Sequence, residues 1–258
     1  MALTSISLRS QDFTYAIMHG TLPVFPKLLD KPPLTQAHYK AIAQRVHPDL
    51  QSLSSSLQGA KYSPFLEPSI MQAYQELSIV IAYKESSIGK EKQLDMLEIE
   101  YFDTLWLRVQ HELISLTASS FLREISDVQK ICGLVIKMFV GHYQVGLYYH
   151  FATIESLVNK TMELFKSLDL QECWEEYPEL MLWAFLLTIY ATTDPMKQEW
   201  FLFELAKGVR NRVVWEWKTV REILLGFFYV DRVYQEKFRA ICEEVRVLNR
   251  FAAQMESA

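Results

Sequence analysis

The chain has 258 residues, of which 50% are hydrophobic and 13% aromatic, with only eight glycines and nine prolines. This composition indicates a packed globule and excludes a disordered chain, a collagen-like chain and the glycine-rich turns of an all-β fold. The formal net charge is -5 at pH 7 and the pI is about 5.7, so no global positive field attracts a phosphate backbone. We therefore expect no direct binding to nucleic acid.

The three cysteines, Cys132, Cys173 and Cys242, lie far apart in the sequence. An odd number of widely spaced thiols does not fit a disulfide framework and is typical of a reducing compartment. We therefore predict an intracellular protein, nuclear or cytoplasmic and not secreted, in which these thiols are small buried hydrophobic side chains.

Two segments bear on secretion and membrane insertion. Arg9, Asp12 and His19 interrupt the first twenty residues, where a signal peptide would need a charged start followed by an apolar run. The longest apolar stretch, residues 180–191, is shorter than the ~20 residues that a membrane-spanning helix needs. We expect neither secretion nor membrane association, and we interpret this stretch as a buried helix.

The first 33 residues are rich in proline and predict an irregular arm, residues 1–33, that packs over the body of the protein. The prolines are Pro23, Pro26, Pro32 and Pro33. Each proline lacks a backbone donor and restricts the residue before it, which disfavours regular structure. A short helix at residues 13–18 is the exception that we predict in this arm.

The sequence pattern of residues 34–258 predicts one helical domain. A helix over residues 35–46 begins with Thr35 as a cap and ends at His47-Pro48. A serine run followed by Gly59 and two prolines then predicts a mobile loop over residues 51–68.

After this loop, apolar side chains recur at three- and four-residue spacing along the rest of the chain. The predicted helices cover residues 70–86, 94–115, 121–139, 145–168, 178–192, 196–214, 218–229 and 233–253. Pro178 and Pro195 suit first helical turns, and Asp194 and Asp231 suit helix caps. We therefore predict an all-α fold: a single compact domain of about eight to ten helices arranged as antiparallel pairs.

Three aromatic segments in the second half follow a known spacing. They read Pro178-Glu179-Leu180-Met181-Leu182-Trp183-Ala184, then Trp200-Phe201, then Trp217-Lys218-Thr219-Val220-Arg221-Glu222-Ile223-Leu224 with Phe227-Phe228 after it. In this order they resemble the last part of the helical regulatory domain of fungal-specific transcription factors, which reads P-x-L-L-W-A, W-F and W-x-x-V-x-x-I-L followed by an aromatic. The resemblance covers the chain from Tyr148 onward.

This resemblance implies a non-catalytic regulatory or sensing domain of transcription, for instance for secondary metabolism, that acts through a protein partner or a bound apolar small molecule. Family members that bind DNA carry a six-cysteine zinc cluster near the N-terminus, whereas no cysteine here precedes Cys132. We therefore expect no DNA contact by this chain, no metal and no cofactor. A homodimer stays open as an alternative.

Large aromatic and histidine side chains are the candidates for lining a pocket between helices. We select His142, Tyr143, Tyr149, His150, Trp183, Trp200 and Trp217. The three tryptophans, together with Phe228, are also expected to be buried in the helical core, because such large side chains must pack against neighbouring helices.

Two other functions remain as alternatives. The first is an enzyme or ligand carrier of a biosynthetic pathway, since a fold does not fix a function. The second is a co-chaperone, because Tyr39 and the following His47-Pro48-Asp49 are similar to the second helix and loop of J-domains, and residues 72–77 are similar to their third helix. A zinc site is not predicted, because no two histidines stand four residues apart and no two cysteines are close.

Overall fold

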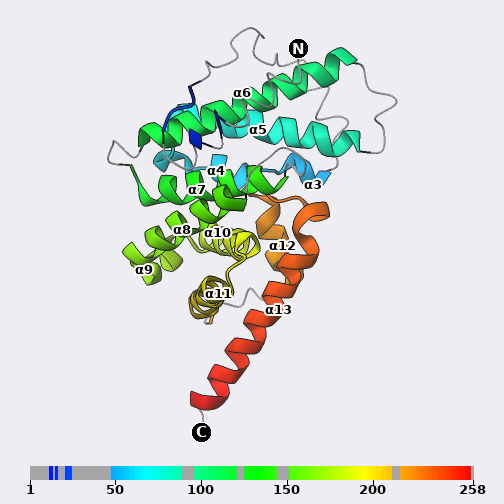
Figure 1. Cartoon of the computed structure of the whole chain (residues 1–258). Helices are drawn as coiled ribbons and strands as arrows, with labels where there is room; N and C mark the ends of the chain where they lie inside the picture. Colours follow the sequence, from blue (N-terminus) through cyan, green and yellow to red (C-terminus); the bar gives the residue numbers. More distant parts are fainter. Residues whose placement is uncertain are drawn as a thin grey trace. The chain divides into compact units, whose positions relative to one another are not determined.

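The computed structural model describes residues 12–13, 15–16, 21–24, 48–88, 96–120, 125–143, 151–210 and 216–256. Within these ranges every regular element is a helix, which confirms the predicted all-α class (Figure 1). Contacts divide the chain into two compact units, one of Met1–Lys130 with Leu225–Phe228 and one of Ile131–Leu224 with Tyr229–Ala258. The predicted helix 35–46 and the predicted boundary after residue 33 lie outside the described residues.

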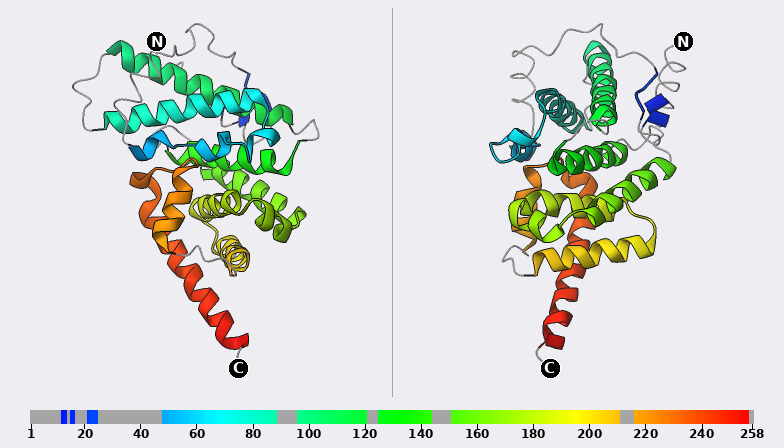
Figure 2. Two further views of the ribbon diagram at one scale, coloured as in Figure 1. Left: turned by 180° about the vertical axis from the view of Figure 1, so that it is seen from behind. Right: turned by 90° about the vertical axis from the view of Figure 1, so that its left-hand side faces the viewer.

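The first unit is built around a pair of long helices. Its described elements are α3 (Pro48–Gln51), α4 (Ser55–Gln58), the 3-10 turn η1 (Ser63–Phe65), α5 (Pro68–Ser87) and α6 (Met96–Ser120). Helices α5 and α6 lie side by side (Figure 2), with the Tyr83 and Phe102 rings stacked at a centroid distance of 3.6 Å. A largely buried ion pair, Arg108 Nη2 to Glu76 Oε2 at 2.7 Å, joins the same two helices.

Residues 51–68, which the sequence predicted to be a mobile loop, contain α4 and η1 and pack against a distant segment of the chain. The backbone N–H groups of Ser54 and Ser56 donate to the carbonyls of Phe227 and Gly226, at 3.2 and 2.8 Å. Ser54 has φ 62°, a left-handed conformation that is uncommon for a residue with a Cβ. Its hydroxyl also lies 2.6 Å from that of Ser78, so hydrogen bonds hold this conformation.

The segment that completes the first unit comes from the C-terminal half of the sequence. Phe227 packs edge-on against Tyr62, and Phe228 packs edge-on against Tyr74. All four rings are fully buried. The helix predicted over residues 218–229 therefore ends early, because its last residues leave the helix and enter this aromatic cluster.

The second unit contains seven helices in its described part. They are α7 (Asp127–Tyr143, of which the first turn belongs to the first unit), α8 (Phe151–Ser167), α9 (Leu170–Glu176), α10 (Pro178–Ala191), α11 (Pro195–Val209), α12 (Trp217–Leu225) and α13 (Asp231–Glu256). Helix α10 is buried from Leu180 to Ile189 and contacts α8, α9, α11 and α13. Because it is apolar on every side, it forms the centre of this unit, and the buried helix predicted for residues 180–191 is confirmed.

The start signals read from the sequence are confirmed for two helices. Pro178 and Pro195 occupy the first turns of α10 and α11, and Asp194 Oδ1 accepts a hydrogen bond from the Met196 N–H at 2.9 Å. Asp169 caps α9 in the same way, and α9 itself was not predicted. Asp231 is the first residue of α13 rather than a residue before it.

The carboxylate of Asp231 joins α12 to α13 across the turn between them. It accepts hydrogen bonds from the Tyr229 hydroxyl at 2.7 Å and from the Arg221 guanidinium, whose Nε lies 3.1 Å from Oδ1. Burial and this acceptor raise the pKa of Tyr229 well above its usual range. The turn is therefore held by a charge-assisted contact as well as by its buried aromatic side chains.

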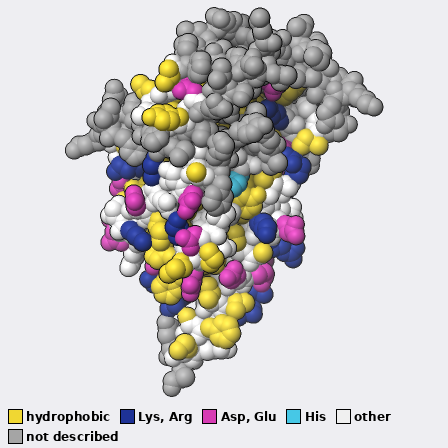
Figure 3. All heavy atoms as spheres, viewed as in Figure 1, with side chains coloured by type: hydrophobic (Ala, Val, Ile, Leu, Met, Phe, Trp, Pro, Cys, Tyr) yellow, Lys and Arg dark blue, Asp and Glu magenta, His cyan; other side chains and the backbone are white. Residues whose placement is uncertain are grey.

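Helix α13 is amphipathic along its first half and exposes apolar side chains along its second. Tyr234, Phe238 and Val245 are fully buried, and the Tyr234 hydroxyl donates to the Phe139 carbonyl of α7 at 3.3 Å. Toward the C-terminal end, hydrophobic side chains reach the surface (Figure 3), among them Phe251 with 61% of its area exposed.

The predicted burial of the large aromatic residues holds for two of the four. Trp183 and Phe228 are fully buried, whereas Trp200 and Trp217 are only half-buried. Trp217 is the first residue of α12, and Trp200 lies on the outer side of α11, where Lys166 Nζ stands 5.3 Å from its ring centroid. Both rings therefore keep part of their surface in contact with solvent.

The contact between Gly208 and Trp174 gives a test of the packing of α9 on α11. A Cβ at position 208 would overlap the Trp174 indole, which also stacks on Phe185. We expect Gly208→Ala to lower the free energy of unfolding by about 1–2 kcal/mol, despite the better helix propensity of alanine. Urea unfolding followed by tryptophan fluorescence measures this loss.

A double-mutant cycle provides the control for this prediction. In a Trp174→Leu background the smaller side chain leaves room for the added methyl group, so Gly208→Ala should cost less than in the native chain. An equal cost in both backgrounds would show that the clash with the indole is not the cause.

Candidate functional site

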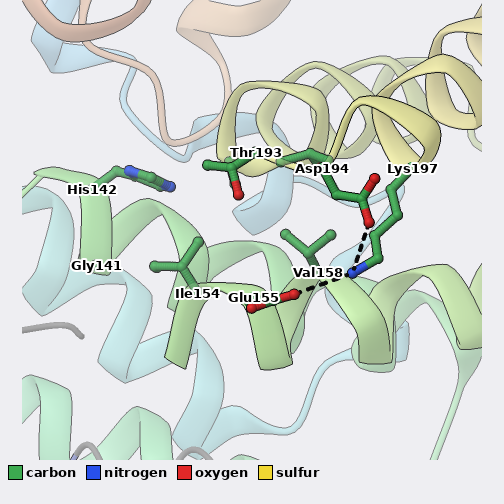
Figure 4. Close-up of a pocket in the computed structure, with 10 residues that line it drawn as sticks. Gly141, His142, Ile154, Glu155, Val158, Thr193, Asp194 and Lys197 are labelled. Atoms are coloured by element: carbon green, nitrogen blue, oxygen red, sulfur yellow. Dashed lines mark hydrogen bonds and ion pairs between the residues drawn. The ribbon is translucent and has the colours of Figure 1, made fainter. Parts of the chain in front are cut away.

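A pocket of about 270 Å³ lies in the second unit, where the ends of four helices meet (Figure 4). Its lining consists of Gly141, His142, Ile154, Glu155, Val158, Ala191, Thr192, Thr193, Asp194 and Lys197. These residues come from the end of α7, the first turns of α8, the α10–α11 connection and the first turn of α11. The short connection between α10 and α11 brings the last turn of one helix close to the first turn of the next.

The apolar wall of the pocket comes mainly from α8. Ile154 and Val158 stand four residues apart, so their side chains lie on one face of this helix. Both are buried, and Ala191 at the end of α10 adds a third apolar group. This wall offers a surface for the apolar part of a ligand.

The polar side of the pocket contains two carboxylates and one ammonium group. Lys197 Nζ lies 3.4 Å from Glu155 Oε1 and 3.6 Å from Asp194 Oδ2, as the dashed lines in Figure 4 show. Asp194 is fixed in place because its other oxygen, Oδ1, caps α11. These three groups together carry one excess negative charge.

His142 stands at the other side of the pocket, with its ring directed toward Thr193 (Figure 4). The imidazole packs edge-on against Tyr190 at a centroid distance of 5.1 Å. Its Nε2 atom is buried and has no hydrogen-bond partner among the described residues. Burial lowers the pKa of His142 to about 4, so the ring is neutral at pH 7 and can act as both donor and acceptor.

Of the residues predicted to line a pocket, His142 is the one that the structure places there. Tyr143 is buried and stacks on Phe139, and Trp183 lies in the middle of α10. Trp200 and Trp217 lie on α11 and α12 and take no part in the lining. Tyr149 and His150 lie outside the described residues.

The sequence did not predict the charged residues of the pocket. Glu155 and Lys197 stand on amphipathic helices, where exposed charges are common, and Asp194 was recognised only as a helix cap. The cap was nevertheless a usable signal, because it marks the short connection at which the two helix ends meet.

Lys137 on α7 is a second titratable group that the sequence did not single out. Its side chain is 6% exposed. Burial, together with the charge of Lys160, lowers the pKa of Lys137 to about 7. Burial of the ammonium group disfavours the charged form of Lys137 in the folded chain, because the lost hydration is compensated only in part.

The described residues bear on three other expectations from the sequence. None of their His, Cys, Asp and Glu side chains forms a group of three or more that could hold a metal ion. No helix in the described ranges has the length and apolar character to cross a membrane. Of the His47-Pro48-Asp49 motif, Pro48 and Asp49 form the first turn of α3, and His47 lies outside the described residues.

Comparison with protein-family models gives no match for this sequence, and comparisons with curated proteins and with solved structures give none either. The arguments for function therefore come from the chemistry of the pocket and from the residues that resemble a family. The pocket and the first two segments of the resemblance lie in the second unit, where α10 and α11 carry residues of each set, whereas Phe227-Phe228 belongs to the first unit.

The lowered pKa of His142 predicts a pH dependence of stability. Between about pH 4 and pH 6.5 the unfolded chain binds a proton at this residue that the folded chain does not bind, so stability falls as the pH is lowered. We expect His142→Phe to flatten the decline between pH 6.5 and pH 4 by up to about 3 kcal/mol. Urea unfolding of both proteins at several pH values measures the difference, and parallel curves would contradict it.

The buried amine of Lys137 predicts a stabilising substitution. Lys137→Met keeps the length of the side chain and removes the buried charge, so the free energy of unfolding at pH 7 should rise by about 2–4 kcal/mol. The native chain should gain stability between pH 7 and pH 10.5, because the unfolded lysine is protonated there and the folded one is not. The Met variant should lack this gain.

Denaturant titrations at pH 7 and pH 9.5 measure both effects of Lys137→Met. Lys160→Met is the matched control on α8, since Lys160 is only half-buried and should give a smaller gain. A loss of stability in Lys137→Met would show that the amine has a favourable partner in the folded chain.

Proposed function

We propose that this chain is a helical regulatory module that binds a small molecule in the pocket at His142 and acts on transcription through a protein partner. The observation that carries the proposal is the buried Nε2 of His142, which borders an open pocket and has no hydrogen-bond partner among the described residues. A buried polar atom without a partner costs about 1–3 kcal/mol. A ligand that hydrogen-bonds to it recovers this free energy.

The lining of the pocket supports a ligand with two different ends. Ile154, Val158 and Ala191 favour an apolar group, whereas Glu155, Lys197 and Asp194 favour a polar or charged one. Pockets of this kind, mostly apolar with a few fixed polar groups, are typical of small-molecule sites. The ligand proposed is thus amphiphilic, which differs from the apolar molecule expected from the sequence.

The resemblance to fungal-specific transcription factors supports the regulatory part of the proposal. Its first segment, Pro178–Ala184, forms the first half of α10, and the last residue of that helix, Ala191, lines the pocket. Its second segment, Trp200-Phe201, lies on α11, whose first turn also borders the pocket. A ligand at the α10–α11 connection contacts both helices and so stabilises their arrangement.

A ligand carrier in a biosynthetic pathway is the second candidate. The convergence of His142, Glu155, Asp194 and Lys197 on one apolar pocket favours it, because a carrier needs the same specific contacts as a sensor. The two candidates differ in what changes when the pocket is blocked. If the protein is a sensor, blocking the pocket changes transcript levels first. If it is a carrier, blocking the pocket changes metabolite levels and leaves transcript levels unchanged.

Blocking the mouth of the pocket tests these two functions. Thr193 is exposed and lies outside the helices, so Thr193→Trp places a large ring at the opening without disturbing a packed helix. We expect this variant, expressed in the protein's own cells, to reproduce the transcript changes of a deletion strain, as measured by RNA sequencing. Metabolite profiling of the same cultures identifies the carrier.

Thr219→Trp is the matched control, because Thr219 is an exposed threonine on α12 that takes no part in the pocket. It should leave transcripts at the native level. If deletion of the whole protein leaves transcripts unchanged, the regulatory function is wrong, and altered metabolites in Thr193→Trp cells would then support the carrier.

A further inference from the structure

The charges around the pocket define the chemical class of its ligand. Glu155 and Asp194 supply two negative charges, and Lys197 supplies one positive charge. The distances of 3.4 and 3.6 Å from Lys197 Nζ exceed the 2.7–2.9 Å of close charge-assisted hydrogen bonds. The lysine is therefore shared loosely between the two carboxylates, and neither is fully neutralised.

The two carboxylates stand on different helices, and that of Asp194 is held in place before a ligand binds. Glu155 stands on α8, and Asp194 is fixed at the start of α11 by the hydrogen bond from the Met196 N–H to its Oδ1. The second oxygen, Oδ2, faces the ammonium group of Lys197. An acceptor that is already fixed, as Asp194 is, costs little conformational entropy when a donor binds, whereas Glu155 is exposed and, among the described residues, is held by the Lys197 contact alone.

We propose that the pocket binds a small organic amine, with the ammonium group beside Glu155 and Asp194 and the apolar body against Ile154 and Val158. This inference rests on the proposed function, because it names the ligand class of the same pocket. The apolar side chains and Glu155 come from α8, and Asp194 and Lys197 come from the start of α11, so both ends of such a molecule have partners in one pocket.

The neutral state of His142 suits a ligand that carries a positive charge. Burial keeps the imidazole neutral at pH 7, so it does not repel a cation in the pocket. Its Nε2, which has no hydrogen-bond partner among the described residues, can accept a hydrogen bond from an N–H or hydroxyl group of the ligand.

The size of the pocket limits the ligand further. Its volume of about 270 Å³ is slightly below the range of drug-sized pockets. At about 30 Å³ for each water in the liquid, it corresponds to a molecule with on the order of ten non-hydrogen atoms. A phenylalkylamine is of this size.

An anionic ligand is disfavoured by the same residues. It would have to approach two carboxylates to reach one ammonium group, and the N-terminus of α11, which otherwise attracts anions, is already capped by Asp194. The charges of the pocket therefore discriminate between cation and anion.

Three probes that share one apolar body test the ligand class: 2-phenylethylamine, 2-phenylethanol and phenylacetate. Isothermal titration calorimetry with the full chain at pH 7 measures their affinities. An exposed charge pair changes affinity by up to roughly fivefold, so the amine should bind about tenfold more tightly than phenylacetate, with the alcohol between them. Tighter binding of phenylacetate than of the amine would overturn the proposal.

Two variants with opposite effects make the test sharper. Glu155→Gln removes one acceptor charge and should weaken binding of the amine by roughly three- to fivefold. Lys197→Met removes the competing ammonium group, so it should strengthen binding of the amine and weaken binding of phenylacetate. If Lys197→Met weakens amine binding, the ammonium group does not lie beside these carboxylates.

The Thr193→Trp variant separates failure of the ligand class from failure of the pocket. If it abolishes binding of all three probes and the three bind the native chain equally, the pocket is a ligand site but the inference about amines is wrong. If no probe binds the native chain, both the proposed ligand binding and the inference about amines are wrong. The same conclusion follows if all three probes bind Thr193→Trp as tightly as they bind the native chain. Circular dichroism of each variant confirms that its helices are intact.

Discussion

The burial of α10 is the constraint on which the second unit depends. This helix is apolar on all sides, so any face left in water would lose about 25 cal/mol for each Å² of apolar surface. Helices α8, α9, α11 and α13 each contact it. The pocket lies where this cover ends, at Ala191, because the chain must leave the core there and its polar backbone must reach caps and solvent.

Much of this architecture could be predicted from the sequence, because helix periodicity and start signals are local properties. The ranges 70–86 and 178–192 differ by no more than two residues from α5 and α10, and the prolines and Asp194 mark helix starts as expected. The short helix α9 was missed because its seven residues span only two turns, too few to establish a period.

Non-local packing explains the other differences. Residues 226–230 continue the apolar pattern of α12, and nothing within that stretch shows that Phe227 and Phe228 pack against Tyr62 and Tyr74 of the first unit.

The pocket residues were also difficult to predict from the sequence. Tryptophans were chosen because they are large, but large side chains fill space, and the residues around this opening are smaller or charged. His142 was selected because histidines and tyrosines stand close together in this part of the sequence and could form a polar patch in an otherwise apolar body.

His142 and Lys137 show how stability and function compete in the second unit. Each is a basic group buried on α7, and each is held in or near its neutral form because the surroundings do not solvate its charge. Their positions differ in one respect: His142 lines the pocket described above, and Lys137 is not among the residues that line it. A ligand in this pocket can therefore compensate the burial of the histidine but not that of the lysine. The free-energy cost of the buried Nε2 atom of His142 is then recovered when a ligand binds. The pocket at His142 is for this reason a stronger candidate for a functional site than the buried lysine.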